Sequence, residues 1–167
     1  MIRIYLVGFM GAGKTTLGKK LARQLGYSFY DIDKAFEHKY KTSVDLFFNK
    51  YGEELFRKLE YELLVSTFDF ENTVISTGGG TPCFHNGMEL INQNGVSLYI
   101  KLSPEALYYR LTKAKKRRPL VAKKSKEELQ KFINEKLHER EVYYNKADYV
   151  ISGISIKVSQ IVTMIGR

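Results

Sequence analysis

The sequence has a single cysteine, Cys83, among its 167 residues. One thiol cannot form a disulfide within the chain, and there is no Cys-x-x-Cys pair to bind zinc or to carry out thiol exchange. A disulfide-stabilised scaffold and a Cys-x-x-Cys zinc or redox site are therefore excluded.

The sequence also lacks a long apolar run. Its longest stretch without charge, from Asn72 to Met88, is interrupted by Gly78, Gly79, Gly80, Pro82 and Asn86, whereas a membrane span needs about 20 apolar residues. The first residues do not form the basic, apolar and small-residue regions of a secretory signal. We therefore expect a soluble cytoplasmic protein with no membrane partner.

Proline is scarce as well, at three residues, and the chain contains no repeat or low-complexity tract. Tethered modules and solenoids are thus excluded. A chain of this length with 44% hydrophobic residues has room for one sizeable core. We expect residues 1–167 to form a single domain, and we expect a monomer.

Positive charge is plentiful, and it is concentrated in one segment. Eight of the 27 lysines and arginines lie between Lys113 and Lys126, where there is no acidic residue, and the rest of the chain is close to neutral. Such a segment is either a solvated loop or a loop that handles phosphate groups. Binding of nucleic acid is a third possibility.

The pattern of apolar residues predicts alternating strands and helices. The expected strands are Ile2–Val7, Ser28–Ile32, Val74–Ser76, Val96–Leu102 and Tyr149–Ile151. The expected helices are Thr15–Leu25, Lys34–His38, Val44–Phe68, Gly87–Asn94, Pro104–Lys113, Lys126–Tyr144 and Lys157–Ile165. This alternation predicts an α/β fold with three layers, α/β/α, around a parallel sheet, and such sheets bind ligands beyond the carboxyl ends of their strands.

The segment Gly8–Thr15 matches the phosphate-binding loop pattern G-x-x-x-x-G-K-[ST]. It lies between a predicted strand and a predicted helix, which is the context that this motif requires. The glycines allow backbone N–H groups to face the phosphates, Lys14 adds a point charge, and Thr15 is suited to ligate Mg²⁺. The candidate ATP-binding residues here are Gly11, Ala12, Gly13, Lys14, Thr15 and Thr16.

A GTPase is not indicated, although Asn145–Asp148 reads as NKxD. In a GTPase that motif closes a strand, whereas here it precedes one. No aspartate has a glycine three positions later, so a switch motif is missing. We interpret NKxD as a coincidence.

Two acidic residues, Asp31 and Asp33, end the second predicted strand. Alternation along a strand points both carboxylates to one side, at the ligand-binding end of the sheet. Asp31 could hold Mg²⁺ through water, while Asp33 could accept a proton from an attacking hydroxyl or orient it. The alternative for Asp33 is a helix N-cap.

Arg57 and the triple glycine Gly78–Gly80 are the remaining candidates. Glu53 and Glu60 stand four and three residues from Arg57 in a predicted helix and can hold its guanidinium in place for an acidic substrate. A surface ion pair is the other reading. The glycines follow a strand and expose backbone N–H groups to a small polar ligand, or they form a plain flexible turn. We assign no chemistry to Cys83 or to the three histidines.

Together these motifs, with Arg118-Pro119-Leu120 and with Arg140 and Tyr144, resemble the shikimate kinase family. The resemblance covers nearly the whole chain and thins after Tyr149. It implies a P-loop kinase fold with sheet order 2-3-1-4-5, a mobile lid at about residues 112–125 and substrate-binding helices at about residues 33–62. It also implies transfer of the γ-phosphoryl group of ATP to the 3-hydroxyl of shikimate, with Mg²⁺ as cofactor.

The resemblance also implies roles for single residues. Asp33 binds the region of the reacting hydroxyl, and Glu60 steadies Arg57. Arg118 closes the lid over ATP, and Arg110 packs near the adenine. The implied substrate-binding residues are Asp33, Arg57, Gly78, Gly79, Gly80 and Arg140, and the implied catalytic residues are Lys14, Asp33 and Arg118. Adenine contacts in the last loop are indicated only weakly, around Ser152 to Lys157.

Three other functions compete with this one. Another small-metabolite kinase, such as a gluconate kinase, also needs a phosphate loop and a lid, but Arg57, Arg140 and the triple glycine count against it. A nucleic-acid-binding protein would leave the phosphate loop unexplained. An ATP-binding module without catalysis is disfavoured because Lys14, Asp33 and Arg118 are all present.

Overall fold

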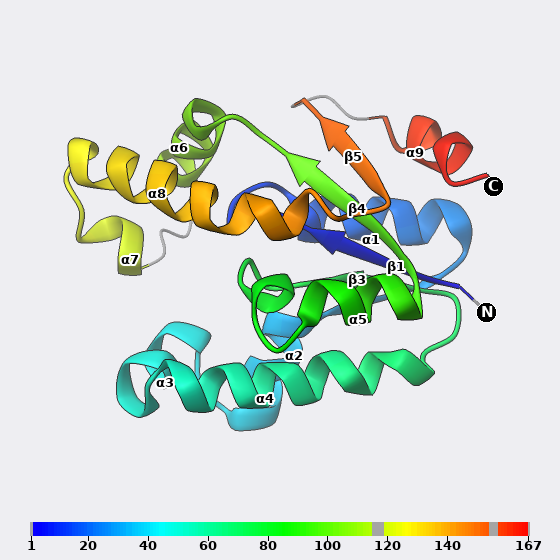
Figure 1. The fold of residues 1–167 in the computed structure, drawn as a ribbon, viewed down its shortest axis with the longest axis horizontal. Coiled ribbons are helices and arrows are strands. Elements are labelled where there is room, and N and C mark those ends of the chain that lie inside the picture. The colour runs from blue at the N-terminus through cyan, green and yellow to red at the C-terminus, as the bar shows by residue number, and fades with distance from the viewer. Residues whose placement is uncertain (1, 115–118, 154–156, 167) are drawn as a thin grey trace.

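Five parallel strands form the centre of the protein in a computed structural model that describes residues 2–114, 119–153 and 157–166 (Figure 1). The strands are β1 (Arg3–Val7), β2 (Ser28–Asp31), β3 (Thr73–Ser76), β4 (Val96–Lys101) and β5 (Tyr149–Ser152). Their order in the sheet is β2-β3-β1-β4-β5. The predicted fold class and strand order are confirmed.

Strand β1 lies at the centre, paired with β3 on one side and with β4 on the other. Tyr5 is opposite Ile75 in β3, and Leu6 is opposite Leu98 in β4, and all four side chains are buried. Strands buried on both faces need continuous apolar sequences, which explains why this stretch does not alternate with polar residues. The loop that follows β1 is therefore anchored to a strand whose residues Ile4 to Val7 are fully buried.

Helices cover both faces of the sheet. Helix α1 (Lys14–Leu25) packs beside α9 (Val158–Met164) behind the sheet in Figure 1, while α4 (Glu53–Ser66), α5 (Gly87–Asn94) and α8 (Lys126–Tyr144) lie in front of it. The other helices are α2 (Ile32–Tyr40), α3 (Val44–Tyr51), α6 (Pro104–Lys113) and α7 (Pro119–Ala122), with 3₁₀ turns η1 (Thr67–Asp69) and η2 (Thr81–Cys83). This is the predicted three-layer arrangement.

The sequence-based prediction of one helix over Val44–Phe68 is wrong. Gly52, with φ of 85°, separates α3 from α4, and its N–H closes α3 by donating to the Phe48 carbonyl. A positive φ is costly for any residue with a Cβ, so glycine sets the break. The segment ends in η1 rather than in a continued α-helix.

Helix α2 begins at Ile32, two residues before the predicted start. Asp33 therefore lies in the first turn of a helix and not at the end of a strand. The short helix α7 was not predicted. The ranges of α5, α6 and α8 agree with the predictions, and apart from the break at Gly52 no other boundary differs by more than two residues.

Asp148, the last residue of the NKxD sequence, links two strands. Its carboxylate accepts a hydrogen bond of 2.9 Å from the Ser97 N–H, and its own N–H donates to the Ser97 hydroxyl at 2.9 Å. Because these bonds hold β4 beside the start of β5, Asp148 has a structural role here. Within the described residues, no helix combines the length and apolar character of a membrane span.

Candidate functional site

The phosphate-binding loop joins β1 to α1, as predicted. Gly8 has φ of 146°, and a Cβ there would lie 2.9 Å from the carbonyl oxygen of Ile100 in β4. Gly13, the residue before α1, has φ of 98°. Both positions favour glycine because their φ angles are positive, and Gly8 also has no space for a Cβ beside β4. The loop thus reaches its shape only with the glycines that the sequence supplies.

Lys14 is buried within this loop. Its ammonium group donates hydrogen bonds to the carbonyl oxygens of Gly8 at 2.7 Å and of Phe9 at 2.9 Å. Charged donors make stronger hydrogen bonds than neutral ones. The side chain therefore folds back over the loop and is held at the cavity that the loop borders.

A cavity of about 310 Å³ lies beside this loop. Among its lining residues are Gly11, Gly13, Lys14, Thr15, Thr16, Asp31, Asp33, Gly79 and Arg110. Ala12 is itself buried, and its carbonyl accepts a hydrogen bond of 3.4 Å from Arg110. The structure thus gathers the predicted loop residues, both aspartates and Arg110 around one space.

Asp31 binds two groups at once. One carboxylate oxygen accepts a hydrogen bond of 2.7 Å from the Thr15 hydroxyl, and the other caps α2 by accepting 3.1 Å from the Lys34 N–H. The N-cap considered for Asp33 is therefore made by Asp31. Asp33 still lines the same cavity, although from a helix rather than by alternation along a strand.

The triple glycine directly follows Thr77, which ties it to β1. The Thr77 hydroxyl donates to the Leu6 carbonyl at 2.9 Å, and its N–H donates to the same oxygen at 3.1 Å. A Cβ on Gly79 would lie 3.4 Å from the Met10 nitrogen in the phosphate loop. The glycines are thus packed beside that loop and do not form a plain flexible turn.

Each of the three glycines also leaves space for a predicted site residue. A Cβ on Gly78 would lie 2.9 Å from a carboxylate oxygen of Asp33. On Gly79 it would lie 3.1 Å from a nitrogen of Arg140. On Gly80 it would lie 2.5 Å from a nitrogen of Arg57, a distance at which the guanidinium would have to move. The three charged side chains therefore converge on this loop.

Arg57 is held from several sides. Its Nε donates to Glu53 at 3.3 Å, its Nη1 donates to Glu60 at 2.8 Å, and its guanidinium carbon lies 4.1 Å from the centre of the Phe84 ring. Arg57 is 7% exposed and Glu60 is 3% exposed. The reading of Arg57 as a surface ion pair is therefore wrong, because both members of the central pair are buried.

Arg140 approaches from α8, on the other side of the glycines. One turn later on the same helix, the buried Tyr144 donates a hydrogen bond to the Gly79 carbonyl. Burial raises the pKa of the Tyr144 hydroxyl, which therefore stays protonated and keeps donating near neutral pH. Tyr144 thus fixes the backbone of the loop that Arg140 contacts.

Cys83 has no catalytic character in this setting. Burial raises the pKa of its thiol to about 11, although the nearby charges of Arg140 and Arg57 lower it. A nucleophilic cysteine needs the thiolate form. This agrees with the prediction that Cys83 carries no chemistry.

Arg118 lies outside the described residues, as do Lys115, Lys116 and Arg117 of the basic segment and residues 154–156 of the predicted adenine loop. Lys113, Lys123 and Lys126 are exposed. Arg110, which opens the segment, lies against the phosphate loop.

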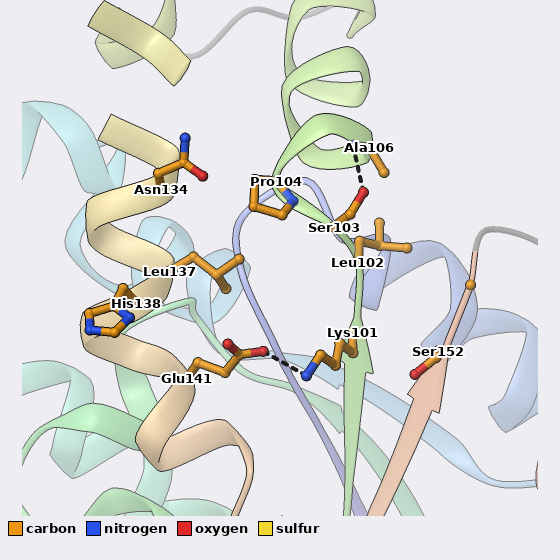
Figure 2. Close-up of a pocket in the computed structure, with 11 residues that line it drawn as sticks. Lys101, Leu102, Ser103, Pro104, Ala106, Asn134, Leu137, His138, Glu141 and Ser152 are labelled. Carbon is orange, nitrogen blue, oxygen red and sulfur yellow. Dashed lines mark hydrogen bonds and ion pairs between the residues drawn. The ribbon is translucent and has the colours of Figure 1, made fainter. Parts of the chain in front are cut away.

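A second cavity, of about 620 Å³, lies between α8 and the end of β4 (Figure 2). An ion pair of 3.0 Å joins Lys101 and Glu141 within it, and Ser152 lies at its edge. None of the predicted phosphate-loop, aspartate, arginine or glycine residues lines it. It is thus separate from the cavity at the phosphate loop, although Ser152 and Gly153, at the start of the weakly predicted adenine region, line it.

Sequence reasoning missed two residues of the site, Thr81 and Phe84. Thr81 donates to Glu60 at 2.8 Å, and Phe84 stacks on Arg57. Both residues follow the triple glycine closely in the sequence, and this proximity was the one signal that could have pointed to them.

Comparison with known proteins points to one family. The family model for shikimate kinase matches residues 10–167. A curated shikimate kinase from Phocaeicola vulgatus is 46% identical over 150 residues, which cover 90% of this chain and 86% of that protein.

Two solved structures are also similar. The shikimate kinase from Bacteroides thetaiotaomicron has a TM-score of 0.96 at 38% identity and covers 99% of both chains. The shikimate kinase from Acinetobacter baumannii in complex with shikimate has a TM-score of 0.86 at 32% identity, covering 99% of this chain and 90% of the other.

Proposed function

The chain belongs to the shikimate kinase family and is an ATP-dependent kinase, and we propose that it transfers the γ-phosphoryl group of ATP to the 3-hydroxyl group of shikimate. The products are shikimate 3-phosphate and ADP, in the pathway to aromatic amino acids. The family assignment confirms the resemblance read from the sequence.

The observation that carries the proposal is the convergence of Asp33, Arg57 and Arg140 on the triple glycine, beside the phosphate loop. Two arginines are suited to bind one carboxylate, because a guanidinium offers paired donors in a plane. A ligand bound here would place its carboxylate near Arg57 and Arg140 and a hydroxyl near Asp33. Shikimate, an acid that also carries ring hydroxyls, has both groups. We assign the substrate to this position.

ATP is assigned to the phosphate loop. Lys14 would contact the β- and γ-phosphates, and the backbone N–H groups of Gly11 to Thr16 would surround them. The hydrogen bonds from Lys14 to Gly8 and Phe9 fix its ammonium in advance, so little ordering is needed on binding.

The residues next to Lys14 fit a magnesium ion. The Thr15 hydroxyl and the Asp31 carboxylate are 2.7 Å apart at the cavity, and oxygen ligands of this kind are those that Mg²⁺ takes, together with water and phosphates. The described residues contain no group of three or more His, Cys, Asp or Glu side chains that could hold a metal ion, which suits an ion shared with the nucleotide. Bound Mg²⁺ supplies charge neutralisation at the phosphates.

Asp33 acts on the acceptor. As the hydroxyl oxygen bonds to the γ-phosphorus, the bond from that phosphorus to the β–γ bridging oxygen breaks, and ADP leaves. The hydroxyl proton passes to the Asp33 carboxylate. Arg57 and Arg140 keep the acceptor oriented throughout.

The lid assignment at about residues 112–125 rests on the basic segment and on Arg110 against the phosphate loop. Arg118 would neutralise the transferring group and help to exclude water. Replacement of Arg118 by Ala should lower kcat, and unchanged turnover would remove this role.

We also propose that residues 1–167 form a single domain in which helices α2 to α4 lie on the substrate side. The protein is proposed to be a cytoplasmic monomer that does not bind nucleic acid. Light scattering after size-exclusion chromatography tests whether the protein is a monomer. Salt-dependent binding of an oligonucleotide would contradict the proposal that it does not bind nucleic acid.

Product analysis tests the central proposal. Purified protein with ATP, Mg²⁺ and shikimate should give a phosphate monoester at the 3-position, identified by phosphorus–proton NMR correlation, and an excess of EDTA should stop its formation. Absence of the ester in the presence of Mg²⁺, or its formation at another hydroxyl, would refute the proposal.

A further inference from the structure

The turn that follows the triple glycine contacts the Arg57–Glu60 pair. Thr81, in η2, is 3% exposed, and its hydroxyl donates to Glu60 Oε2 at 2.8 Å. The other oxygen of Glu60 accepts from Arg57 Nη1 at 2.8 Å. Thr81 and Arg57 thus each occupy one oxygen of the same buried carboxylate.

Arg57 has five N–H groups. Two of them bind Glu53 and Glu60, and in the described part of the chain the other three have no hydrogen-bond acceptor. These three are the donors available to a substrate carboxylate. The number of Arg57 donors left for a ligand therefore depends on whether Glu60 Oε2 accepts a hydrogen bond from Thr81 or from Arg57.

From this arrangement we infer that Thr81 is a positioning residue, which keeps Glu60 from taking a further donor of Arg57. This inference rests on the proposed function for its choice of substrate. Without the Thr81 hydroxyl, Glu60 Oε2 would be a buried, charged acceptor with no partner, a costly state. Arg57 is the other hydrogen-bond donor to this carboxylate, so the carboxylate would turn toward it and draw the guanidinium from its place against Gly80.

The small hollow lined by Arg57, Glu60, Thr81 and Phe84 has no space for a water molecule, so water cannot replace the Thr81 hydroxyl from that side. Valine has nearly the shape of threonine, so Thr81→Val removes the hydroxyl without opening that space. Among the described residues every buried polar side-chain atom has a partner, and this variant would leave Glu60 as an exception.

The test compares Thr81→Val with Thr81→Ser, which keeps a hydroxyl. We expect Thr81→Val to raise the KM for shikimate about tenfold while the KM for ATP stays within about twofold, and Thr81→Ser to restore both values to near those of the wild type. Wild-type KM for shikimate in Thr81→Val, or equal defects in the two variants, would overturn the inference.

Thr67→Val is the matched control. Thr67 is also buried, and its hydroxyl also makes hydrogen bonds, to Tyr5 and to the Leu64 carbonyl. This variant should lose thermal stability but keep both KM values. A similar rise in its KM for shikimate would mean that the effect is one of general stability, and the inference would fall.

A second readout needs no substrate. Because the guanidinium would be drawn away from Glu53, the acceptor of its Nε–H, the NMR signal of that Nε–H, identified by its loss in Arg57→Lys, should exchange with water at least about tenfold faster in Thr81→Val than in the wild type or in Thr81→Ser. An exchange rate in Thr81→Val equal to that of the wild type would overturn the inference, whichever substrate accepts the phosphoryl group. Faster exchange in a protein that does not phosphorylate shikimate would keep the inference and reject the proposed substrate.

Discussion

The Arg57 guanidinium lies directly against the Cα of Gly80, so that a Cβ on that glycine would be 2.5 Å from Arg57 Nη1. The φ of Gly80 is −95°, a value open to any residue. Glycine is therefore needed at this position for space and not for backbone conformation.

Gly80→Ala should consequently impair substrate binding more than folding. We expect the added methyl group to displace Arg57 and to raise the KM for shikimate by at least about tenfold, with ATP binding unchanged. Steady-state kinetics with each substrate varied in turn measures this.

Gly26→Ala is the control for that variant. Gly26 has φ of 69° and no neighbour within 4 Å of an added Cβ, so the change should cost about 1 kcal/mol of stability and leave both KM values unchanged. If Gly80→Ala behaved like Gly26→Ala, Arg57 would not be the group that binds the substrate.

Asp33→Asn keeps the size of the side chain but removes its basicity. We expect kcat to fall by about 10² to 10⁴-fold, the usual contribution of general acid–base catalysis, while the affinity for ATP, measured by calorimetry, stays within about twofold. Asp45→Asn, in α3, is the control and should keep kcat. Turnover by Asp33→Asn at the wild-type rate would remove Asp33 from the mechanism.

Lys14→Ala should differ from Asp33→Asn in weakening the binding of ATP, because Lys14 lies at the phosphate loop. The variant should bind ATP at least about tenfold more weakly and also transfer phosphate more slowly. Calorimetric titration with ATP and single-turnover kinetics separate the two effects. Wild-type affinity for ATP would contradict the placement of the nucleotide in this loop.

Stability should fall at alkaline pH. Burial raises the pKa of Tyr5, Tyr30, Tyr99 and Tyr144 in the folded protein. Between the unfolded value, near 10, and the raised value, the folded state holds more protons than the unfolded state, so stability is complete below about pH 10 and is lost as the pH rises above it. Over the pH range between its unfolded and folded pKa values, a tyrosine such as Tyr99 contributes a slope of about 1.4 kcal/mol per pH unit.

Urea unfolding at pH 8 to 11 measures that slope. Tyr99→Phe should reduce it by about one proton, whereas Tyr109→Phe, at a side chain that is 63% exposed, should leave it unchanged. A free energy of unfolding that is constant up to pH 11 would contradict the burial argument.

The parts of the site that are contiguous in the sequence could be predicted. The phosphate loop, the triple glycine and the Arg57–Glu60 spacing each follow from a local pattern, because backbone geometry and helical spacing fix their shape. Asp33 was placed in the right cavity for the wrong local reason, since α2 begins at Ile32 and takes Asp31 as its cap.

Features that depend on packing between distant segments could not be predicted. The contact of Phe84 with Arg57 and the bond from Tyr144 to Gly79 join residues from different elements, and their chemistry leaves no periodic signal. The break at Gly52 was missed because one glycine within an amphipathic pattern is compatible with a continuous helix. The single positive φ at that residue decides between the two.

The release of ADP from ATP and Mg²⁺, measured with and without shikimate and with gluconate as the control acid, tests the account most directly. We predict that ADP forms at a substantial rate only when shikimate is present. ADP formed with neither acid, or with gluconate alone, would leave the phosphate loop in place and contradict the assignment of shikimate as the acceptor.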